Sequence, residues 1–342
     1  MANGLFATLI VGTILALVAD LVGDIPGAFC STVSFYVRIM ASVAKTAMGA
    51  GIGIGVAKKY GASDLVTVSA AVTGFVGAFA SQLLAGSVFD GVVTTVKIPG
   101  EPLGAFVAAF VAIEVGMLVS GKTKVDILVT PLVSIISGTV AGLLVGAPIS
   151  TLMTWIGKVV CAFTEEQPFM MGIVVSVVMG MVLTLPISSA ALGIMLGLNG
   201  ITAGAAAIGC SAQMVGFAVS SYRENKMGGL IAQGVGTSML QVPNIFRRPL
   251  IWVPPTLTAA ILGPISTCVL HLVNNASGSG MGTSGLVGPI MGYQEMTAAG
   301  IAPWLAVCEI LLMYIVAPAI ISLGISEGMR KIGWIHSGDM KL

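Results

Sequence analysis

Residues 188–221 read SSAALGIMLGLNGITAGAAAIGCSAQMVGFAVSS, an apolar stretch that is interrupted at its centre. The interruption, LNGITAG, places Asn199, Gly200 and Thr202 where a simple membrane helix would continue. Irregular backbone at membrane depth is tolerated only where it is buried in protein or lines a wet cavity. The stretch therefore predicts a re-entrant hairpin inside a larger membrane protein.

Two further stretches are broken in the same way. Residues 228–246, GGLIAQGVGTSMLQVPNIF, are interrupted by GVG and then by Pro243, and residues 277–292, SGSGMGTSGLVGPIMG, are too short and too rich in glycine for a span. Many transporters build their substrate sites from discontinuous segments of this kind. The three stretches are thus the part of the chain in which we expect a site.

The composition places the whole chain in a membrane. Of its 342 residues 56% are hydrophobic and only 8% are charged, whereas a soluble domain carries roughly 25% charged residues. The net charge of +1 gives no indication of a nucleic-acid partner. Two distant histidines and five isolated cysteines form no metal-ligand spacing, so we expect no metal and no cofactor.

Apolar runs long enough to cross a membrane recur along the chain. We predict an all-α polytopic membrane protein with about 8–10 transmembrane helices plus re-entrant hairpins. The run 28–57 is too long for one straight span and predicts an interfacial helix followed by a span. Residues 149–168, with Trp155, Lys158, Glu165 and Glu166, predict an interfacial stretch. The runs are 4–22, 28–57, 65–89, 102–120, 127–148, 169–185, 250–273 and 298–323.

Basic residues predict the orientation, because cytoplasmic loops are enriched in lysine and arginine. We expect five clusters of basic residues and both termini to lie on the cytoplasmic side. The first hairpin then enters from the cytoplasm and returns there, residues 277–292 dip in from outside, and the two tips meet near mid-membrane. The clusters are Lys58–Lys59, Lys122–Lys124, Arg223–Lys226, Arg247–Arg248 and Arg330–Lys331.

Three motifs resemble a known family. The run SMLQVPNIFRRPLIWVPPTLTAAILGPISTCVL (238–270), the segment GSGMGTSGLVGP (278–289) and the stretch IGVAKKYGASDL (54–65) are similar to the enzyme IIC-like proteins of the perfringolysin O regulator family. That family is related to the sugar permease subunit, enzyme IIC, of the bacterial phosphotransferase system. The resemblance extends along nearly the whole chain and is most specific between Ser238 and Gly292.

The resemblance implies an architecture and a mechanism. We expect one integral membrane domain over residues 1–342, with a dimerisation scaffold in 1–168 and a transport part with re-entrant hairpins in 169–342. It implies a homodimer in the bacterial cytoplasmic membrane that carries a sugar by an elevator-type movement. The chain has neither a IIA nor a IIB domain, so it is not expected to be an enzyme, and separate IIA and IIB proteins are possible partners.

One position departs from the pattern of the related permeases. Their hairpin motif GITE supplies a carboxylate to the sugar, and Gly200, Ile201 and Thr202 match it, but Ala203 stands at the place of the acid. A sugar hydroxyl would thereby lose its charged acceptor, and charge-assisted hydrogen bonds are roughly twice as strong as neutral ones.

Candidate solute-binding residues are polar groups on apolar segments. Each has a structural alternative. Polar groups at a helix break can instead satisfy freed backbone groups, and His271 fits a helix end beside Asn274 and Asn275 as well as a general base. The glycine-rich segment 280–288 fits a packed turn as well as a loop whose amides point at a ligand. Glu114 and Glu309 are acids within apolar runs. The candidates are Asn199, Thr202, Gln213, Gln241, Asn244, His271, Thr283, Ser284 and Glu295.

The function that we predict is transport of a small polar solute, most simply a sugar or sugar-like compound, across the lipid bilayer. The alternative is a membrane-embedded ligand sensor or regulator that binds without transporting. A membrane enzyme has no nucleophile–base pair or metal-spaced cluster to support it. Solute flux into liposomes distinguishes transport from sensing.

Overall fold

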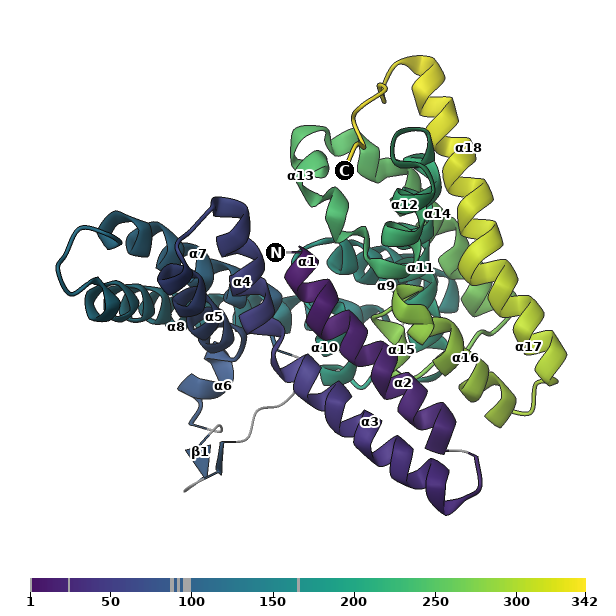
Figure 1. Cartoon of the computed structure of the whole chain (residues 1–342). Coiled ribbons are helices and arrows are strands. Elements are labelled where there is room, and N and C mark those ends of the chain that lie inside the picture. The colour runs from purple at the N-terminus through teal and green to yellow at the C-terminus, as the bar shows by residue number, and fades with distance from the viewer. Residues whose placement is uncertain (1, 24, 87–88, 91–92, 95–99, 165–166) are drawn as a thin grey trace. The chain divides into compact units, whose positions relative to one another are not determined.

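The computed structural model describes residues 2–23, 25–86, 89–90, 93–94, 100–164 and 167–342, and these are mostly helical (Figure 1). Contacts divide the chain into two units, Met1–Trp155 and Ile156–Leu342. The division falls inside a helix, whereas the sequence placed the change from scaffold to transport part between residues 168 and 169. The roles assigned to the two parts stay predictions.

The first unit consists of helices that pack against their neighbours in the chain, as α2 packs on α3 and α5 on both α4 and α7. α4 ends at Gly61, whose left-handed backbone (φ 68°) favours glycine. The described elements are α1 (Ala2–Leu5), the π-helix η1 (Phe6–Ile10), α2 (Val11–Gly23), α3 (Ala28–Thr46), α4 (Met48–Tyr60), α5 (Asp64–Ala78), α6 (Ala80–Leu84), the antiparallel pair β1 (Phe89–Asp90) and β2 (Val93–Thr94), α7 (Pro102–Val119) and α8 (Asp126–Thr164).

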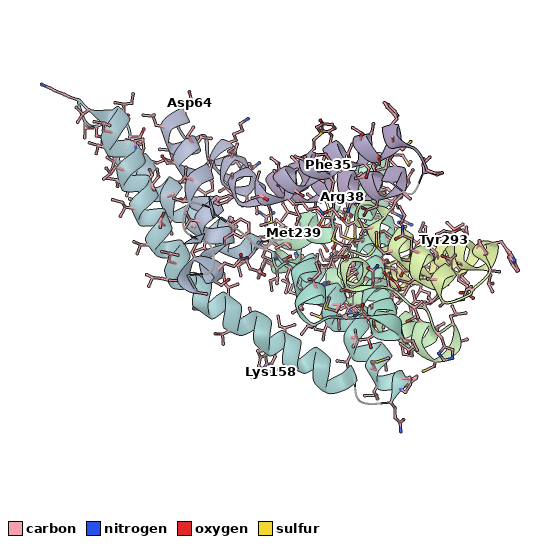
Figure 2. The ribbon with its side chains drawn as sticks, turned by 90° about the horizontal axis from the view of Figure 1, so that it is seen from below. Phe35, Arg38, Asp64, Lys158, Met239 and Tyr293 are labelled. Carbon is pink, nitrogen blue, oxygen red and sulfur yellow. The ribbon has the colours of Figure 1, made fainter. Side chains whose placement is uncertain are left out.

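The long run 28–57 is two helices, which confirms that it is not one straight span. α3 and α4 meet at Ala47 with a bend of 52°. Figure 2 shows Phe35 and Arg38 projecting from α3, and the Arg38 guanidinium lies 2.7 Å from the Asp20 carboxylate on α2. This ion pair joins α2 to α3.

The stretch 149–168 forms no element of its own, because α8 continues through it to Thr164, and its interfacial position stays a prediction. The helix has 39 residues and contains Pro131 and Pro148, so at 1.5 Å per residue it is about 58 Å long. Residues 149–164 contain one charged residue, the exposed Lys158 (Figure 2), and otherwise apolar and hydroxyl side chains without proline, which gives the chain no reason to break the helix. Glu165 and Glu166 lie outside the described residues.

The second unit is built around one helix, α11 (Gly200–Ser220), which α9 and α14 flank. Of its apolar window 89% is buried. The other elements are α9 (Pro168–Thr184), α10 (Ser189–Met195), α12 (Tyr222–Ile231), the π-helix η2 (Ala232–Gly236), the 3₁₀-helix η3 (Ser238–Gln241), α13 (Val242–Arg247), η4 (Pro249–Trp252), α14 (Val253–Pro264), η5 (Ile265–Val269), α15 (Ala276–Ser279), η6 (Ser284–Leu286), α16 (Val287–Ala298), α17 (Pro303–Ile310), η7 (Leu311–Val316) and α18 (Ala317–Ile332).

Small residues allow other segments to approach α11 closely. A Cβ atom on Gly204 would overlap the carbonyl oxygen of Leu272, and one on Gly209 would overlap the carbonyl oxygen of Ser176. Glycine at such positions lets helix backbones come together within a membrane. The glycine-rich composition of this stretch therefore has a direct packing consequence.

The chain is an all-α polytopic membrane protein. Within the described residues five helices are long and apolar enough to cross a membrane, and the bent pair α3–α4 makes a sixth. Three more apolar segments, Ala7–Gly23, Asp64–Ala78 and Pro168–Thr184, are shorter than a typical span. The number of 8–10 transmembrane helices depends on these three and stays a prediction.

Candidate functional site

The first hairpin is formed by α10, a turn at residues 196–199, and α11. Asn199 precedes α11 with an extended backbone, is exposed, and donates its side-chain N–H to the Gly197 carbonyl at 2.8 Å. Thr202, one turn later, donates to the Met171 sulfur at 3.4 Å. Both side chains therefore have local partners at the beginning of α11.

The second hairpin runs from α15 through η6 and returns along α16. At its tip the buried hydroxyls of Thr283 and Ser284 donate to the Gly234 and Gly236 carbonyls of η2, at 2.6 and 2.9 Å. A π-helix departs from the regular α-helical hydrogen-bond pattern, and these two hydroxyls satisfy the carbonyls of Gly234 and Gly236. The amides predicted to point at a ligand are largely occupied, because those of Met281, Ser284, Leu286 and Gly288 donate to carbonyls within the same segment.

The two tips do not meet, which corrects the sequence-based expectation. The backbone of Gly200, at the first tip, pairs with Asn274 at the base of the second hairpin. Ser189, at the base of the first hairpin, donates to the Gly280 carbonyl at 2.6 Å. The Thr283 hydroxyl lies 3.6 Å from the Met214 sulfur, which is about 20 Å along α11 from Gly200. The hairpins overlap side by side because each satisfies polar groups of the other.

Gln213 is the predicted residue around which polar groups from four other elements gather. Its Oε1 accepts hydrogen bonds from Trp252 Nε1 at 3.0 Å and Thr184 Oγ1 at 3.2 Å, and its Nε2 donates to Thr256 Oγ1 at 3.0 Å. The indole N–H can only donate, which fixes the orientation of the amide. Thr184 also lies 2.9 Å from Ser238 of η3. We name Gln213, Thr184, Ser238, Trp252 and Thr256 the glutamine network.

A pocket of about 310 Å³ opens beside this network. Trp252 and Thr256 belong to its wall, while Gln213 lies behind them with no exposed surface. The hydrogen bond from Gln213 uses the Thr256 oxygen as an acceptor, and among the described residues no hydrogen bond donated by the Thr256 hydroxyl is found. The pocket thus presents an aromatic ring and an almost entirely apolar surface, and Thr256 is its one hydroxyl-bearing lining residue. Its lining is Met181, Pro249, Trp252, Val253, Thr256 and Leu257.

The remaining predicted residues lie apart from this pocket. Gln241 and Asn244 hydrogen-bond one another at 2.8 Å and bind the C-terminal segment. His271 is exposed and has a left-handed backbone with φ 47°. The Glu295 carboxylate accepts from Asn275 Nδ2 at 3.2 Å.

The two acids flagged within apolar runs differ. Glu114 is exposed, whereas Oε2 of Glu309 is buried and has no hydrogen-bond partner among the described residues.

Sequence reasoning missed Trp252, Thr184, Ser238, Thr256 and the structural role of Asn274. Asn274 is 1% exposed, and its Nδ2 donates to the Gly288 carbonyl and to the Tyr314 hydroxyl, both at 2.9 Å. An asparagine after an apolar run carries a detectable signal, the high energetic cost of an amide at membrane depth. Single threonines and serines carry none, because they satisfy themselves on their own helix.

One family model matches the chain along its whole length. The family model described as "Phosphotransferase system, EIIC" matches residues 1–342. Comparisons with curated proteins and with solved structures gave no match. Enzyme IIC is the membrane permease component through which the phosphotransferase system carries sugars across the membrane. With a polytopic helical fold and a match along its whole length, the chain belongs to the enzyme IIC family of the phosphotransferase system.

Proposed function

We propose that this chain binds a sugar or sugar-like solute in the pocket beside the glutamine network and transports it across the bacterial cytoplasmic membrane. The observation that carries the proposal is the position of Thr256, held by Gln213 with its hydroxyl proton unused beside the Trp252 ring. Small-molecule sites combine apolar and aromatic walls with a few oriented polar groups. A sugar, with hydroxyls on its rim and C–H groups on its faces, matches such a wall.

The proposed site is electrically neutral. The pocket lining consists of Met, Pro, Trp, Val, Thr and Leu side chains, none of which carries a charge. A neutral solute requires no counter-charge at membrane depth, where charges are expensive. These features favour an uncharged sugar over a sugar acid.

We further propose that transport proceeds by an elevator-type movement of the second unit in a homodimer. Support comes from the division of the chain into two units and from family membership. Any phosphorylation of the solute would be performed by separate IIA and IIB proteins. The sensor alternative shares the pocket but requires no movement of solute across the bilayer.

The test begins with purified protein and a thermal-shift screen of hexoses, pentoses, sugar alcohols and sugar acids. Binding to the native state alone stabilises by RT ln(1 + [L]/Kd), about 2.7 kcal/mol at a hundredfold excess over Kd. The sugar with the largest shift then serves as the radiolabelled probe in liposomes. Flux above that of protein-free vesicles supports transport, and saturable binding without flux supports the sensor.

A matched pair of variants locates the site. Thr256→Val should raise the Kd of the probe sugar about tenfold, the equivalent of about 1.4 kcal/mol. Thr297→Val is the control, because the Thr297 hydroxyl donates to carbonyls of its own helix α16. Equal affinity in both variants would place the solute elsewhere.

A further inference from the structure

The last ten residues of the chain, 333–342, form an irregular segment with a turn at residues 337–340 that folds back on the second unit, and we name it the C-terminal strap. α18 ends at Gly333 with φ 82°, and the amides of Gly333 and Trp334 donate to carbonyls of the last helical turn. Ile335 and Met340 are 2% and 0% exposed. They pack in a cluster with Phe217, Ile245, Ile251 and Met329. Two apolar anchors therefore fix a segment that has no regular secondary structure.

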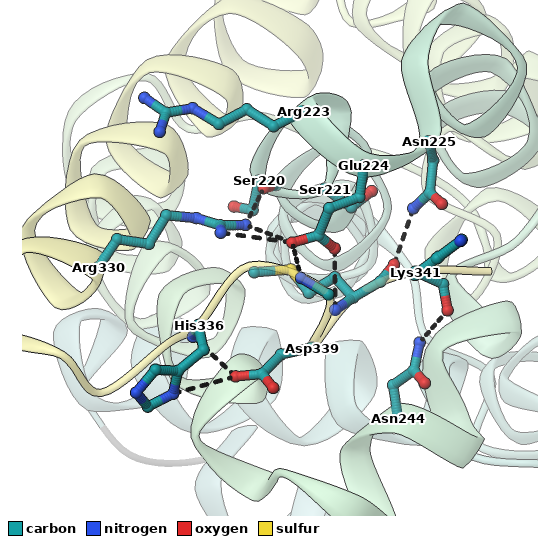
Figure 3. A network of polar contacts seen from close by, with 12 residues as sticks. Ser220, Ser221, Arg223, Glu224, Asn225, Asn244, Arg330, His336, Asp339 and Lys341 are labelled. Atoms are coloured by element: carbon teal, nitrogen blue, oxygen red, sulfur yellow. Dashed lines mark hydrogen bonds and ion pairs between the residues drawn. The ribbon is translucent and has the colours of Figure 1, made fainter.

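Glu224 of α12 binds the backbone of the strap. Its oxygens accept the amide of Gly338 at 3.0 Å and the amide of Met340 at 2.9 Å, and Oε1 also pairs with Arg330 at 3.2 Å (Figure 3). The side chains of Glu224 and Arg330 are only 6% and 10% exposed. A buried carboxylate requires such partners, so strap and ion pair complete one another.

Three amide side chains bind the rest of the strap. Asn225 donates to the Met340 carbonyl at 2.8 Å and accepts the Leu342 amide at 2.9 Å. Gln241 donates to the Met340 carbonyl at 2.9 Å, and Asn244 donates to that of Lys341 at 3.0 Å (Figure 3). The surface binds mostly the backbone of the strap, Arg248 adds an ion pair to the Asp339 side chain at 3.7 Å, and the buried Met340 side chain sets the register.

The strap is connected to the proposed solute site through Gln241. The Nε2 that binds Met340 also donates to Gln233 Oε1 at 2.9 Å. Gln233 belongs to η2, whose carbonyls hold the tip of the second hairpin. Gln241 ends η3, whose first residue, Ser238, contacts Thr184 of the glutamine network. Gln233 and Gln241 have no exposed surface, so loss of the strap leaves a buried donor unpaired at this junction.

We propose that residues Glu224, Asn225, Gln241 and Asn244 form a peptide-binding surface that the C-terminal strap occupies, and that this occupancy positions η2 and η3 for solute binding. The second half of the statement rests on the proposed function. The strap touches no solute. It acts by keeping the second hairpin and Ser238 in place. Release of the strap at Gln241, the last residue of η3, therefore loosens Ser238 at the other end of η3 and with it the proposed solute site.

The test uses the full-length protein and hydrogen exchange measured by mass spectrometry. Met340→Asp should release the strap and speed exchange of peptides covering 333–342 and 230–245 at least tenfold. Met340→Leu keeps the apolar anchor and should exchange like wild type, as should Lys341→Ala, whose side chain is exposed. Gly338→Pro is the second releasing variant, since it removes the amide that binds Glu224 and proline cannot adopt the φ of 99° that Gly338 has.

The outcomes separate the two halves of the proposal. Fast exchange of 333–342 in the wild type would overturn strap binding. A released strap with unchanged exchange over 230–245 would overturn its positioning role. With the probe sugar, both releasing variants should raise Kd at least fivefold, and an unchanged Kd overturns the link to solute binding. If no sugar binds the wild type, the proposed function fails. The exchange data still show whether the strap is bound and whether it positions residues 230–245.

Discussion

Replacing Gln213 by leucine removes the acceptor of the indole N–H of the partly buried Trp252, and the structure allows the consequence to be worked out. Gln213 makes hydrogen bonds with Thr184, Thr256 and Trp252. Thr184 has an alternative acceptor, the Gly180 carbonyl at 3.3 Å, whereas the Trp252 N–H points in one direction only. One unpaired donor therefore dominates, at a cost of roughly 1–3 kcal/mol in the free energy of unfolding.

A double-mutant cycle isolates this hydrogen bond. Trp252→Phe alone should destabilise less than Gln213→Leu, because Oε1 of Gln213 keeps Thr184 as a donor. In the double variant neither partner is orphaned. The two changes should then be less than additive by roughly 1 kcal/mol, within the range of about 0.6–1.7 kcal/mol for hydrogen bonds between membrane helices.

The assay is reversible denaturation of the purified protein in mixed detergent micelles, followed by circular dichroism. Trp304→Phe, at a side chain that is 70% exposed, is the control for loss of an indole. Additivity to within about 0.5 kcal/mol would show that Gln213 and Trp252 are not coupled, and the glutamine network would then lose its role as a positioning device.

Three further predictions concern orientation, assembly and packing. Cysteines placed at Lys59 and Arg248 should not react with an impermeant maleimide added outside intact cells, because basic clusters stay cytoplasmic; reaction at either position would require a different topology. Native mass spectrometry should give particles of twice 34.6 kDa, and a stable monomer at high concentration would contradict the proposed homodimer. Gly204→Ala should destabilise the fold by about 1–3 kcal/mol, because its Cβ would overlap the Leu272 carbonyl, whereas Gly324→Ala, which faces open space, should be near neutral in thermal unfolding.

The sequence predicts the broken segments well because their signal is local. A break such as LNGITAG in an apolar run disfavours a lipid-facing helix, and the helices are interrupted at residues 196–199 and again between α15 and α16. Membership of the enzyme IIC family is likewise readable from motifs, since the matching residues are contiguous in the chain.

The arrangement of the site was not predictable, because its contacts are not local. Gln213 meets Thr184, Trp252 and Thr256 across 29, 39 and 43 residues of chain, and no periodicity specifies which polar groups will face one another. The same limit explains the tips of the hairpins. Two broken segments that enter from opposite faces are compatible with meeting tips and with side-by-side overlap, and only the pairing of Gly200 with Asn274 decides between them.

The neutral character of the proposed site leads to a last prediction, on pH. The pocket lining carries no charged side chain, as expected at membrane depth, where an unpaired charge is expensive. In the proposed site, recognition rests on Trp252, Thr256 and the positioning residue Gln213, none of which has a side chain that titrates near neutrality. The Kd of the probe sugar should therefore change less than twofold between pH 5.5 and 8.0, measured by isothermal titration calorimetry in detergent. A change of tenfold or more would mean that a titrating carboxylate or histidine contacts the solute, and it would move the site away from the glutamine network.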